Sequence, residues 1–329
     1  MGRLYQKISF APSCFTFYLI VTEYLKIADF AATQKEDKMA QVIINGMLAG
    51  GVYALIAVGL TMIHGVMKIV NFSQGDFLAI GMYLTYAAYK FMPQGSAPYW
   101  LMIPVGAAMY LIGCIIFSTS IKKVIGKGDS NYILLTIGLS YLIQNIIQLV
   151  FGPDFKSIDV SDSLRYGSIN IGEAFLSIPR VIAFMAAAVF VVFVNWFLSK
   201  TDIGRAMRAT SENQVIAESL GIRTGRVYVV AFSLGTVFAG IAGLLLSPMF
   251  LPFPKIGSQF STIAMSAMVL GGLGNIRGAM VGGLVIGLVE SFTSTFISVN
   301  LSQAAINSAL MLVLIFKPYG LFGKKVRAS

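Results

Sequence analysis

Residues 50–81 read GGVYALIAVGLTMIHGVMKIVNFSQGDFLAIG, an apolar run followed at once by a cluster of polar residues and glycines. A helix needs roughly 20 apolar residues to cross a bilayer, and several blocks of the chain reach that length. The 329 residues are 57% hydrophobic and only 12% charged, whereas soluble domains carry about 25% charged residues. Lipid offers no hydrogen-bond partners, so each spanning backbone must satisfy itself as a helix. The sequence therefore predicts an all-α polytopic membrane protein.

The apolar blocks predict eight to nine transmembrane helices, interrupted in places by Gly-rich segments. The nine ranges are 42–62, 76–91, 99–118, 131–151, 178–198, 227–249, 259–275, 278–298 and 303–316.

Basic residues gather in segments that nine spans place on one side of the membrane. These segments are 119–130, 199–226 and the C-terminal tail, with Lys68 and Arg277 in shorter connections. The longest loop on the other side, 152–177, has four acidic and two basic residues. Because cytoplasmic loops collect Lys and Arg, we expect the basic side and the C-terminus to be cytoplasmic. The same rule accounts for the net charge of +10 without a nucleic-acid partner.

Residues 1–38 do not fit the span pattern, which opens at Met39. Three interpretations stand: upstream sequence included by a wrong start, which we favour, an extra span or interfacial helix, or a poor signal peptide. Residues 39–329 are then the transmembrane domain, with its long cytoplasmic loop at 199–226.

Two Gly-containing breaks interrupt the apolar pattern, NFSQGDFLAIG at 71–81 and GGLGNIRGAMVGG at 271–283. Such breaks at corresponding places in two halves indicate a transport path, but both also fit tight cytoplasmic turns. Intramembrane carboxylates are costly and hence functional candidates, although one at a helix start also fits a capping role. The candidate residues of the translocation path or gate are Asn71, Gln74, Asp76, Asn275 and Glu290.

The cytoplasmic loop contains one predicted helix, from Arg205 to Leu220, ended by Gly221. Small or apolar residues recur along it at three- and four-residue spacing. A helix with such a face needs a partner, and its small residues favour a groove on another protein over lipid.

Four motifs resemble the permease subunits of bacterial branched-chain amino-acid ABC transporters. They are NGMLAGGVYALIAVGLTMIHGVMKIVNFSQGDFLAIGMY, GRAMRATSENQVIAESLGI, MVLGGLGNIRGAMVGGLVIGLVES and FKPYGLFGKK, in that order. The resemblance covers residues 40–325. It implies an ABC importer permease bundle in the bacterial inner membrane, and a transport subunit rather than an enzyme.

The resemblance also implies partners: a second related permease, two ATPase subunits that bind ATP, and an extracytoplasmic substrate-binding protein. No cofactor is expected in this chain, which lacks the phosphate-binding G-x-x-x-x-G-K-S/T motif. The family usually has His and Glu where this chain has Gln74 and Asp76, and the Gln argues against a proton role at that position. The loop 201–221 resembles the helix that couples a permease to its ATPase. Its matching residues are Gly204, Arg205, Arg208, Glu212, Ala217, Glu218 and Gly221.

Other interpretations remain open. Related permeases carry urea or short amides, so the substrate is less certain than the family. A secondary transporter or channel that works alone would also have broken helices, but it would not need the docking helix. An intramembrane enzyme would need a nucleophile with a base or a metal set, and the single His and the isolated Cys114 provide neither.

Overall fold

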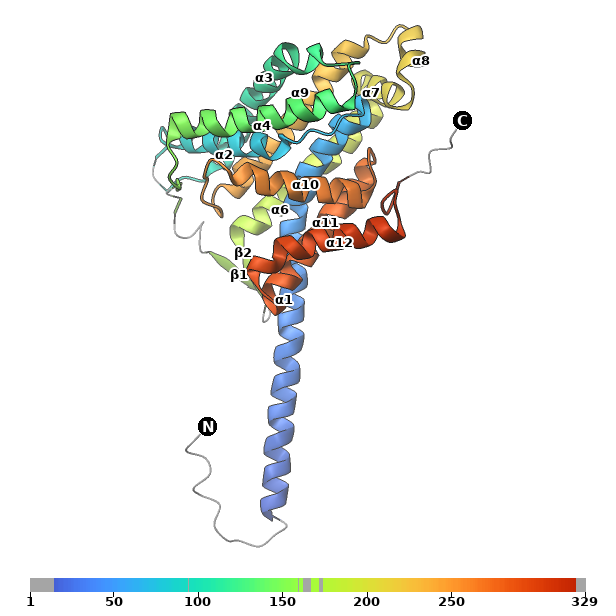
Figure 1. Ribbon diagram of the computed structural model, residues 1–329. Coiled ribbons are helices and arrows are strands. Elements are labelled where there is room, and N and C mark those ends of the chain that lie inside the picture. The colour runs from blue at the N-terminus through green and yellow to red at the C-terminus, as the bar shows by residue number, and fades with distance from the viewer. Residues whose placement is uncertain (1–14, 94, 159, 162–166, 172–173, 324–329) are drawn as a thin grey trace.

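The structure is a computed structural model that describes residues 15–93, 95–158, 160–161, 167–171 and 174–323. These residues form a bundle of helices with one pair of short strands (Figure 1). Some residues of the predicted extension, acidic loop and basic tail lie outside the described part. They are residues 1–14, Asp159, Asp162, Arg165, Glu173, Lys324, Lys325 and Arg327.

The α-helices and strands carry the labels of Figure 1, and the 3-10 helices, which the figure does not label, are called η. In chain order they are α1 (Phe15–Met67), α2 (Gln74–Tyr89), η1 (Pro98–Leu101), α3 (Met102–Thr119), η2 (Ile121–Lys123), α4 (Asp129–Phe151), β1 (Ser168–Ile171), β2 (Ala174–Ser177), α6 (Ile178–Lys200), α7 (Asp202–Glu212), α8 (Gln214–Ser219), α9 (Thr224–Leu246), α10 (Ile256–Gly271), α11 (Ile276–Phe296), η3 (Val299–Leu301) and α12 (Ser302–Phe316). The antiparallel strands, with Ser168 opposite Ser177, lie in the loop predicted at 152–177.

Seven helices of the described residues are long and apolar enough to cross a membrane, which confirms the all-α polytopic prediction. Each of the nine predicted ranges coincides with a helix, but α2 and α10 have only 16 residues. The helix α12 has 15 residues and reaches 18 together with η3, which leads directly into it. Sixteen residues of α-helix extend about 24 Å, less than the hydrocarbon core of about 30 Å. The nine predicted full spans are therefore seven spans and two short helices.

The first helix is continuous from Phe15 to Met67, and its N-terminal part extends beyond the bundle (Figure 1). Met39, where the membrane span begins, is therefore not a helix boundary. The three interpretations of residues 1–38 remain predictions.

Glycines allow α1 to pack closely against α11 at the centre of the bundle. A Cβ atom at Gly50 would lie 2.7 Å from the Cα of Leu284, and one at Gly283 would lie 2.4 Å from the Cα of Ala54. Small residues let helix backbones approach in this way where no hydrophobic effect drives association. This contact fixes α1 as the central helix.

The two short helices begin inside the bundle, next to each other. The backbone N–H of Gly75 in α2 donates to the Ser261 hydroxyl of α10 (2.8 Å), and that hydroxyl donates to the carbonyl of Phe72 (3.0 Å). Irregular backbone at membrane depth is tolerated only where protein covers it. The non-helical segments 68–73 and 247–255 lead into these two helices.

Of the two interpretations of 271–283, the structure shows the tight turn. Residues 272–275 connect α10 to α11, with positive φ at Gly272 and Gly274. The non-helical segment before α10 is 247–255, SPMFLPFPK, whose three prolines cannot continue a helix.

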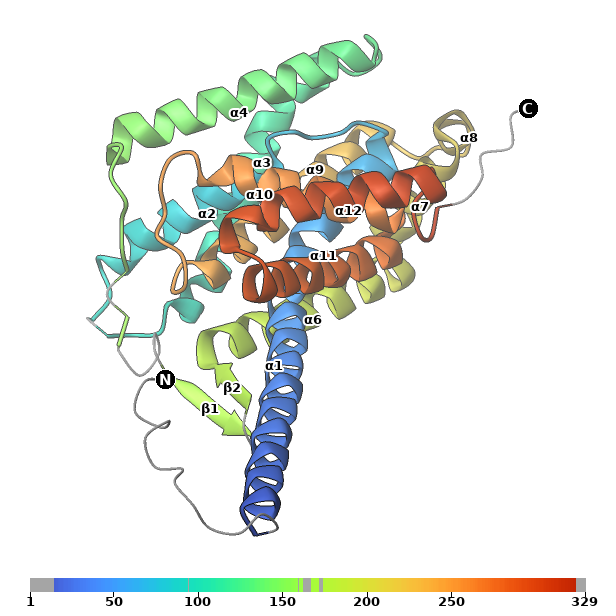
Figure 2. The same ribbon diagram turned by 60° about the horizontal axis from the view of Figure 1, so that its bottom comes forward.

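Several helices leave apolar side chains at the edge of the bundle. On α4, which lies at the edge in Figure 2, Leu134 and Leu149 are 69% and 87% exposed. In a protein with seven membrane spans, such faces contact lipid or another membrane subunit.

Candidate functional site

The polar cluster before α2 is buried and hydrogen-bonded within itself. Asn71 Oδ1 accepts from the Ser73 N–H (3.2 Å) and hydroxyl (2.7 Å), while Asn71 Nδ2 donates to Gln74 Oε1 (3.3 Å). Gln74 Nε2 donates to the carbonyl of Gly235 at the centre of α9 (3.0 Å). Buried polar groups need such partners. Asn71 and Gln74 therefore brace the break against α9.

Asp76 joins three helices at one point. Its side chain is fully buried, and its Oδ1 accepts from Gln144 Nε2 of α4 at 2.9 Å. The same amide nitrogen lies 3.0 Å from Ser258 Oγ of α10. Asp76 stands in the first turn of α2, where the helix dipole favours a carboxylate. The capping interpretation fits that position, but the side chain bonds to α4.

The loop 199–226 contains two helices, α7 and α8, so the prediction of one helix from Arg205 to Leu220 was wrong. Asn213 between them has extended backbone, and its Oδ1 caps α8 by accepting from the Ile216 N–H at 3.1 Å. Asn competes with helical hydrogen bonds and favours such N-cap positions. The break follows from that preference.

The predicted coupling residues divide into packed and exposed ones. A Cβ atom on Gly204 would lie 2.4 Å from the carbonyl oxygen of Phe197, so α7 packs tightly on the end of α6. Ala217 is 1% exposed. Arg205, which pairs with Asp202, is exposed. The other exposed members are Arg208, Glu212, Glu218 and Gly221.

The short helix α8 presents apolar side chains to solvent. Val215, Ile216 and Leu220 at its end are 72%, 58% and 75% exposed. Gly221 follows with a φ of +83° and ends the helix as predicted. A cluster of large exposed apolar residues on a protein surface marks an interaction site.

Glu218 ties α8 to the start of α9. Its Oε1 accepts from the Thr224 hydroxyl (2.7 Å) and from Gln214 Nε2 (3.0 Å). Hydrogen bonds from Gln214 and from Thr224 hold the pKa of this exposed carboxyl below its ordinary value. The carboxylate therefore stays ionised and keeps the connection at neutral pH.

Asn275 lies apart from the buried cluster. Its Oδ1 caps α11 by accepting from the Gly278 N–H (3.2 Å), and its Nδ2 donates to the carbonyl of Phe322 (2.9 Å). It shares a surface hollow with Met207 and Arg208 of α7. Asn275 thus belongs to the end of the bundle that carries α7 and α8.

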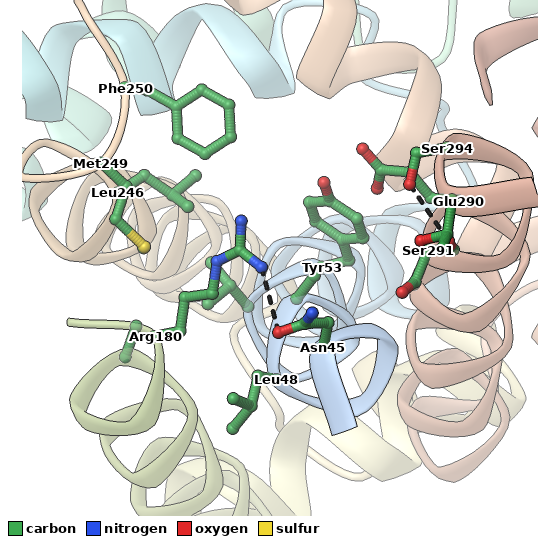
Figure 3. Close-up of a pocket in the computed structure, with 15 residues that line it drawn as sticks. Asn45, Leu48, Tyr53, Arg180, Leu246, Met249, Phe250, Glu290, Ser291 and Ser294 are labelled. Atoms are coloured by element: carbon green, nitrogen blue, oxygen red, sulfur yellow. Dashed lines mark hydrogen bonds between the residues drawn. The ribbon is translucent and has the colours of Figure 1, made fainter. Parts of the chain in front are cut away.

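Glu290 lines a cavity of about 290 Å³ at the opposite end (Figure 3). The cavity lies between the first residues of α6 and the last turns of α9 and α11, and α6 leads away from it to α7. Its polar lining residues are Asn45, Tyr53, Arg180, Glu290, Ser291, Ser294 and Thr295. The five predicted path residues therefore occupy three places: the centre of the bundle and both of its ends.

Most polar residues around Glu290 and Asp76 were not predicted, among them Arg180, Tyr53 and Gln144. Arg180 and Tyr53 face the cavity with Glu290, and Gln144 holds Asp76. Arg180 stands near the start of the apolar run 178–198, and Gln144 stands within the run 131–151. Those were the available signals, since an isolated polar residue in a span is a functional candidate.

A metal site of clustered His, Cys, Asp or Glu side chains is not formed by the part of the chain that the structure describes. No three His, Cys, Asp or Glu side chains there lie close enough together to hold an ion. Cys114 is a free thiol beside the Ser233 hydroxyl (3.2 Å).

Comparison with known proteins connects this architecture to a family. The family described as "Branched-chain amino acid transport system / permease component" matches residues 42–316. The high-affinity branched-chain amino acid transport system permease protein LivH of Escherichia coli (strain K12) is 31% identical over 301 residues, 86% of this chain and 95% of LivH. BraD of Pseudomonas aeruginosa, with the same description, is 30% identical over 295 residues and the same shares.

A second permease protein of the E. coli system, LivM, is 22% identical over 295 residues, 82% of this chain and 67% of LivM. No solved structure matches the chain. The family match runs from the first membrane span through α12 and includes α7 and α8. This chain therefore belongs to the family of branched-chain amino acid transport system permease components, and it is a transport subunit rather than an enzyme.

Proposed function

We propose that this chain forms half of the translocation path of an ATP-driven importer of branched-chain amino acids in the bacterial inner membrane. The family match over residues 42–316 carries the proposal, because it covers the bundle together with α7 and α8. The exposed apolar side chains of α8 support it, since they need a protein partner.

The partners in this proposal are a second related permease, two ATPase subunits and an extracytoplasmic substrate-binding protein. Similarity to both LivH and LivM, two permease proteins named for one system, supports pairing with a related permease. ATP binding is assigned to the ATPase subunits, because this chain lacks the phosphate-binding motif.

The end that carries α7 and α8 is assigned to the cytoplasm. Lys122, Lys123, Arg208 and Arg277 line or flank the surface hollows there, and cytoplasmic loops collect such residues. The chain after α12 returns to the same end, where Leu321 N–H donates to the carbonyl of Leu270 (2.8 Å). The C-terminus is then cytoplasmic, and the Glu290 cavity faces outward.

The helix α6 connects the two ends mechanically. Its last turn holds Gly204 of α7 in backbone contact, and its first turn places Arg180 in the outer cavity. When ATP closes the ATPase dimer against α8, the tight joint at Gly204 passes the movement to α6. The two permeases then rock between outward-facing and inward-facing states.

The path residues take different roles in this mechanism. Asp76 and Glu290 are the carboxylates that we assign to the path or its gate. Asn71 and Gln74 hold the break at the centre, and Asn275 holds the cytoplasmic turn. Because Asp76 contacts α4 and α10 through Gln144 and Ser258, helix movement in transport would open or close this point.

The first test is affinity purification of the tagged chain from its native membrane, followed by mass spectrometry. We expect a second permease and two ATPases, and loss of the ATPases in the variant Leu220→Asp. The matched control is Leu251→Asp, an exposed leucine of the 247–255 segment, which keeps them. ATPases retained by Leu220→Asp would contradict docking on α8.

Uptake into proteoliposomes identifies the substrate class. The complex with its binding protein takes up leucine only with ATP if the proposal is right. Uptake of urea or acetamide instead of leucine would indicate a short-amide permease. ATP-independent leucine uptake by the chain alone would indicate a secondary transporter.

A further inference from the structure

We propose that the Glu290 cavity is a binding site for a free amino acid in its zwitterionic form. The α-ammonium group lies against Glu290, the α-carboxylate against Arg180, and an aliphatic side chain against the apolar wall. The substrate class rests on the proposed function, and the inference adds a substrate site within the permease itself.

Two opposite charges face the cavity without neutralising each other. Glu290 and Arg180 both line it, yet within the described residues neither forms a salt bridge, which requires 4.0 Å or less. The Glu290 Oε2 atom is buried and has no hydrogen-bond partner among those residues. A buried unpaired carboxylate oxygen is costly, and an ammonium group entering the cavity would satisfy it.

One hydrogen bond orients the Arg180 side chain and leaves other N–H groups of its guanidinium available to a ligand. Its Nη1 donates to Asn45 Oδ1 at 3.3 Å, its hydrogen-bond partner within the described residues. A guanidinium has five N–H donors in a planar fork that matches a carboxylate. Figure 3 shows the guanidinium turned toward the cavity, with Tyr53 between it and Glu290.

The remaining wall fits an aliphatic side chain. Its large apolar members are Leu48, Val52, Leu246, Met249 and Phe250. The volume of about 290 Å³ lies at the lower end of the roughly 300–1,000 Å³ usual for small-molecule sites. It suits one amino acid rather than a peptide. Urea and short amides have no charges to match Glu290 and Arg180, so the site selects against them.

The test is direct binding of radiolabelled L-leucine to the whole complex of permeases and ATPases in nanodiscs, without nucleotide or binding protein. We expect saturable binding, weakened at least tenfold by Arg180→Gln and by Glu290→Gln, which corresponds to about 1.4 kcal/mol or more. Lys255→Gln removes an exposed charge outside the cavity and should bind normally. The analogues 4-methylpentanoate and 3-methylbutylamine each lack one of the two charges of leucine. Both should compete only weakly with leucine for binding to the wild-type complex.

The same preparations separate this inference from the proposed function. If the wild-type complex with its binding protein takes up leucine but the complex alone binds none, or if both cavity variants bind like wild type, the zwitterion site is overturned and the importer stands. If leucine uptake itself is absent, both fail. Subunit recovery and a melting temperature equal to wild type in Arg180→Gln and Glu290→Gln exclude misfolding as the cause of lost binding.

Discussion

The side-chain amide of Gln74 connects the non-helical segment 68–73 to the backbone of α9 by hydrogen bonds. It accepts from Asn71 and donates to Gly235, so both ends of its amide are used. A neutral amide can do both, whereas a carboxylate can only accept. The residue type at position 74 therefore follows from a need for one donor and one acceptor in a fully buried place.

We expect Gln74→Glu to destabilise the permease more than Gln74→Met. The glutamate would place an acceptor against the Gly235 carbonyl, at a cost of about 1–3 kcal/mol, while methionine loses the bonds without adding a charge. Thermal unfolding in detergent would measure the difference. Equal melting temperatures of wild type and Gln74→Glu at pH 7 would contradict the role given to the amide.

On the exposed helix α8, the Glu218 carboxyl predicts that the α8–α9 connection does not depend on pH near neutrality. Its pKa in the folded protein is lowered by hydrogen bonds from Gln214 and Thr224. A carboxyl of this kind stabilises the fold above its unfolded pKa and loses that contribution as pH falls through the lowered folded value. Between about pH 6 and 8, well above the ordinary Glu range, the α8–α9 connection should not change.

Hydrogen exchange of residues 214–224, corrected for intrinsic rates, would check this. Protection should be constant over that pH range in the wild type and lower at every pH in Glu218→Ala. A loss of protection as pH falls from 8 to 6 would show that another group controls the connection.

At the scale of elements, the short helices α2 and α10 are placed by glycines. A Cβ atom at Gly81 would lie 2.2 Å from the carbonyl oxygen of Gly240, and one at Gly243 would lie 2.2 Å from that of Leu78. Backbone contact between α2 and α9 therefore holds a helix that is too short to cross the membrane alone. Tight helix contacts of this kind fix where the two non-helical segments fall.

Gly81→Ala should separate α2 from α9 and destabilise the bundle by about 1–3 kcal/mol, the usual cost of overpacking. Gly138→Ala in α4 is the matched control, because no atom lies within 4 Å of its added Cβ. Alanine is the better helix former there, so that variant should be as stable as wild type or more. Thermal unfolding of both variants in detergent would measure the difference. A melting temperature of Gly81→Ala equal to that of wild type would contradict the close contact.

The whole molecule has two chemically different ends. One carries α7, α8 and basic side chains, and the other carries the Glu290 cavity and the strands β1 and β2, at opposite sides of Figure 1. Helices that run between the ends, such as α6, connect α7 to the cavity. The proposed importer needs this connection, because in that proposal ATP acts at one end and the substrate binds at the other.

Membrane orientation can be tested with single cysteines in a chain whose Cys14 and Cys114 are replaced by Ser. Ser219→Cys on α8 should react with a membrane-impermeant maleimide only after the cytoplasmic face is opened. Asp154→Cys, exposed in the loop after α4, should react in intact cells. The reverse pattern would invert the assigned topology.

Much of the architecture could be predicted because it depends on local chemistry. The lengths of the apolar blocks predicted the positions of nine helices, and each of the nine coincides with a helix of the structure. Gly221 predicted the end of α8. The break at Asn213 was missed, since amphipathic spacing outweighed its capping preference. The second break was placed at 271–283 because its glycines stand out. Of the prolines of 247–255, Pro248 was counted into the span 227–249, and Pro252 and Pro254 were left in the connection that follows it.

The sequence by itself determined the membrane class, the family and the basic and non-basic sides, because hydropathy, motif order and charge are properties of the chain alone. Only the tertiary structure decided that α2 and α10 begin inside the bundle, and that Gln144 holds Asp76. It also brought Arg180 to Glu290, 110 positions apart in the chain. The reason is physical: which polar groups share a cavity depends on how helices pack, and close packing at scattered glycines leaves no periodic signal along the chain.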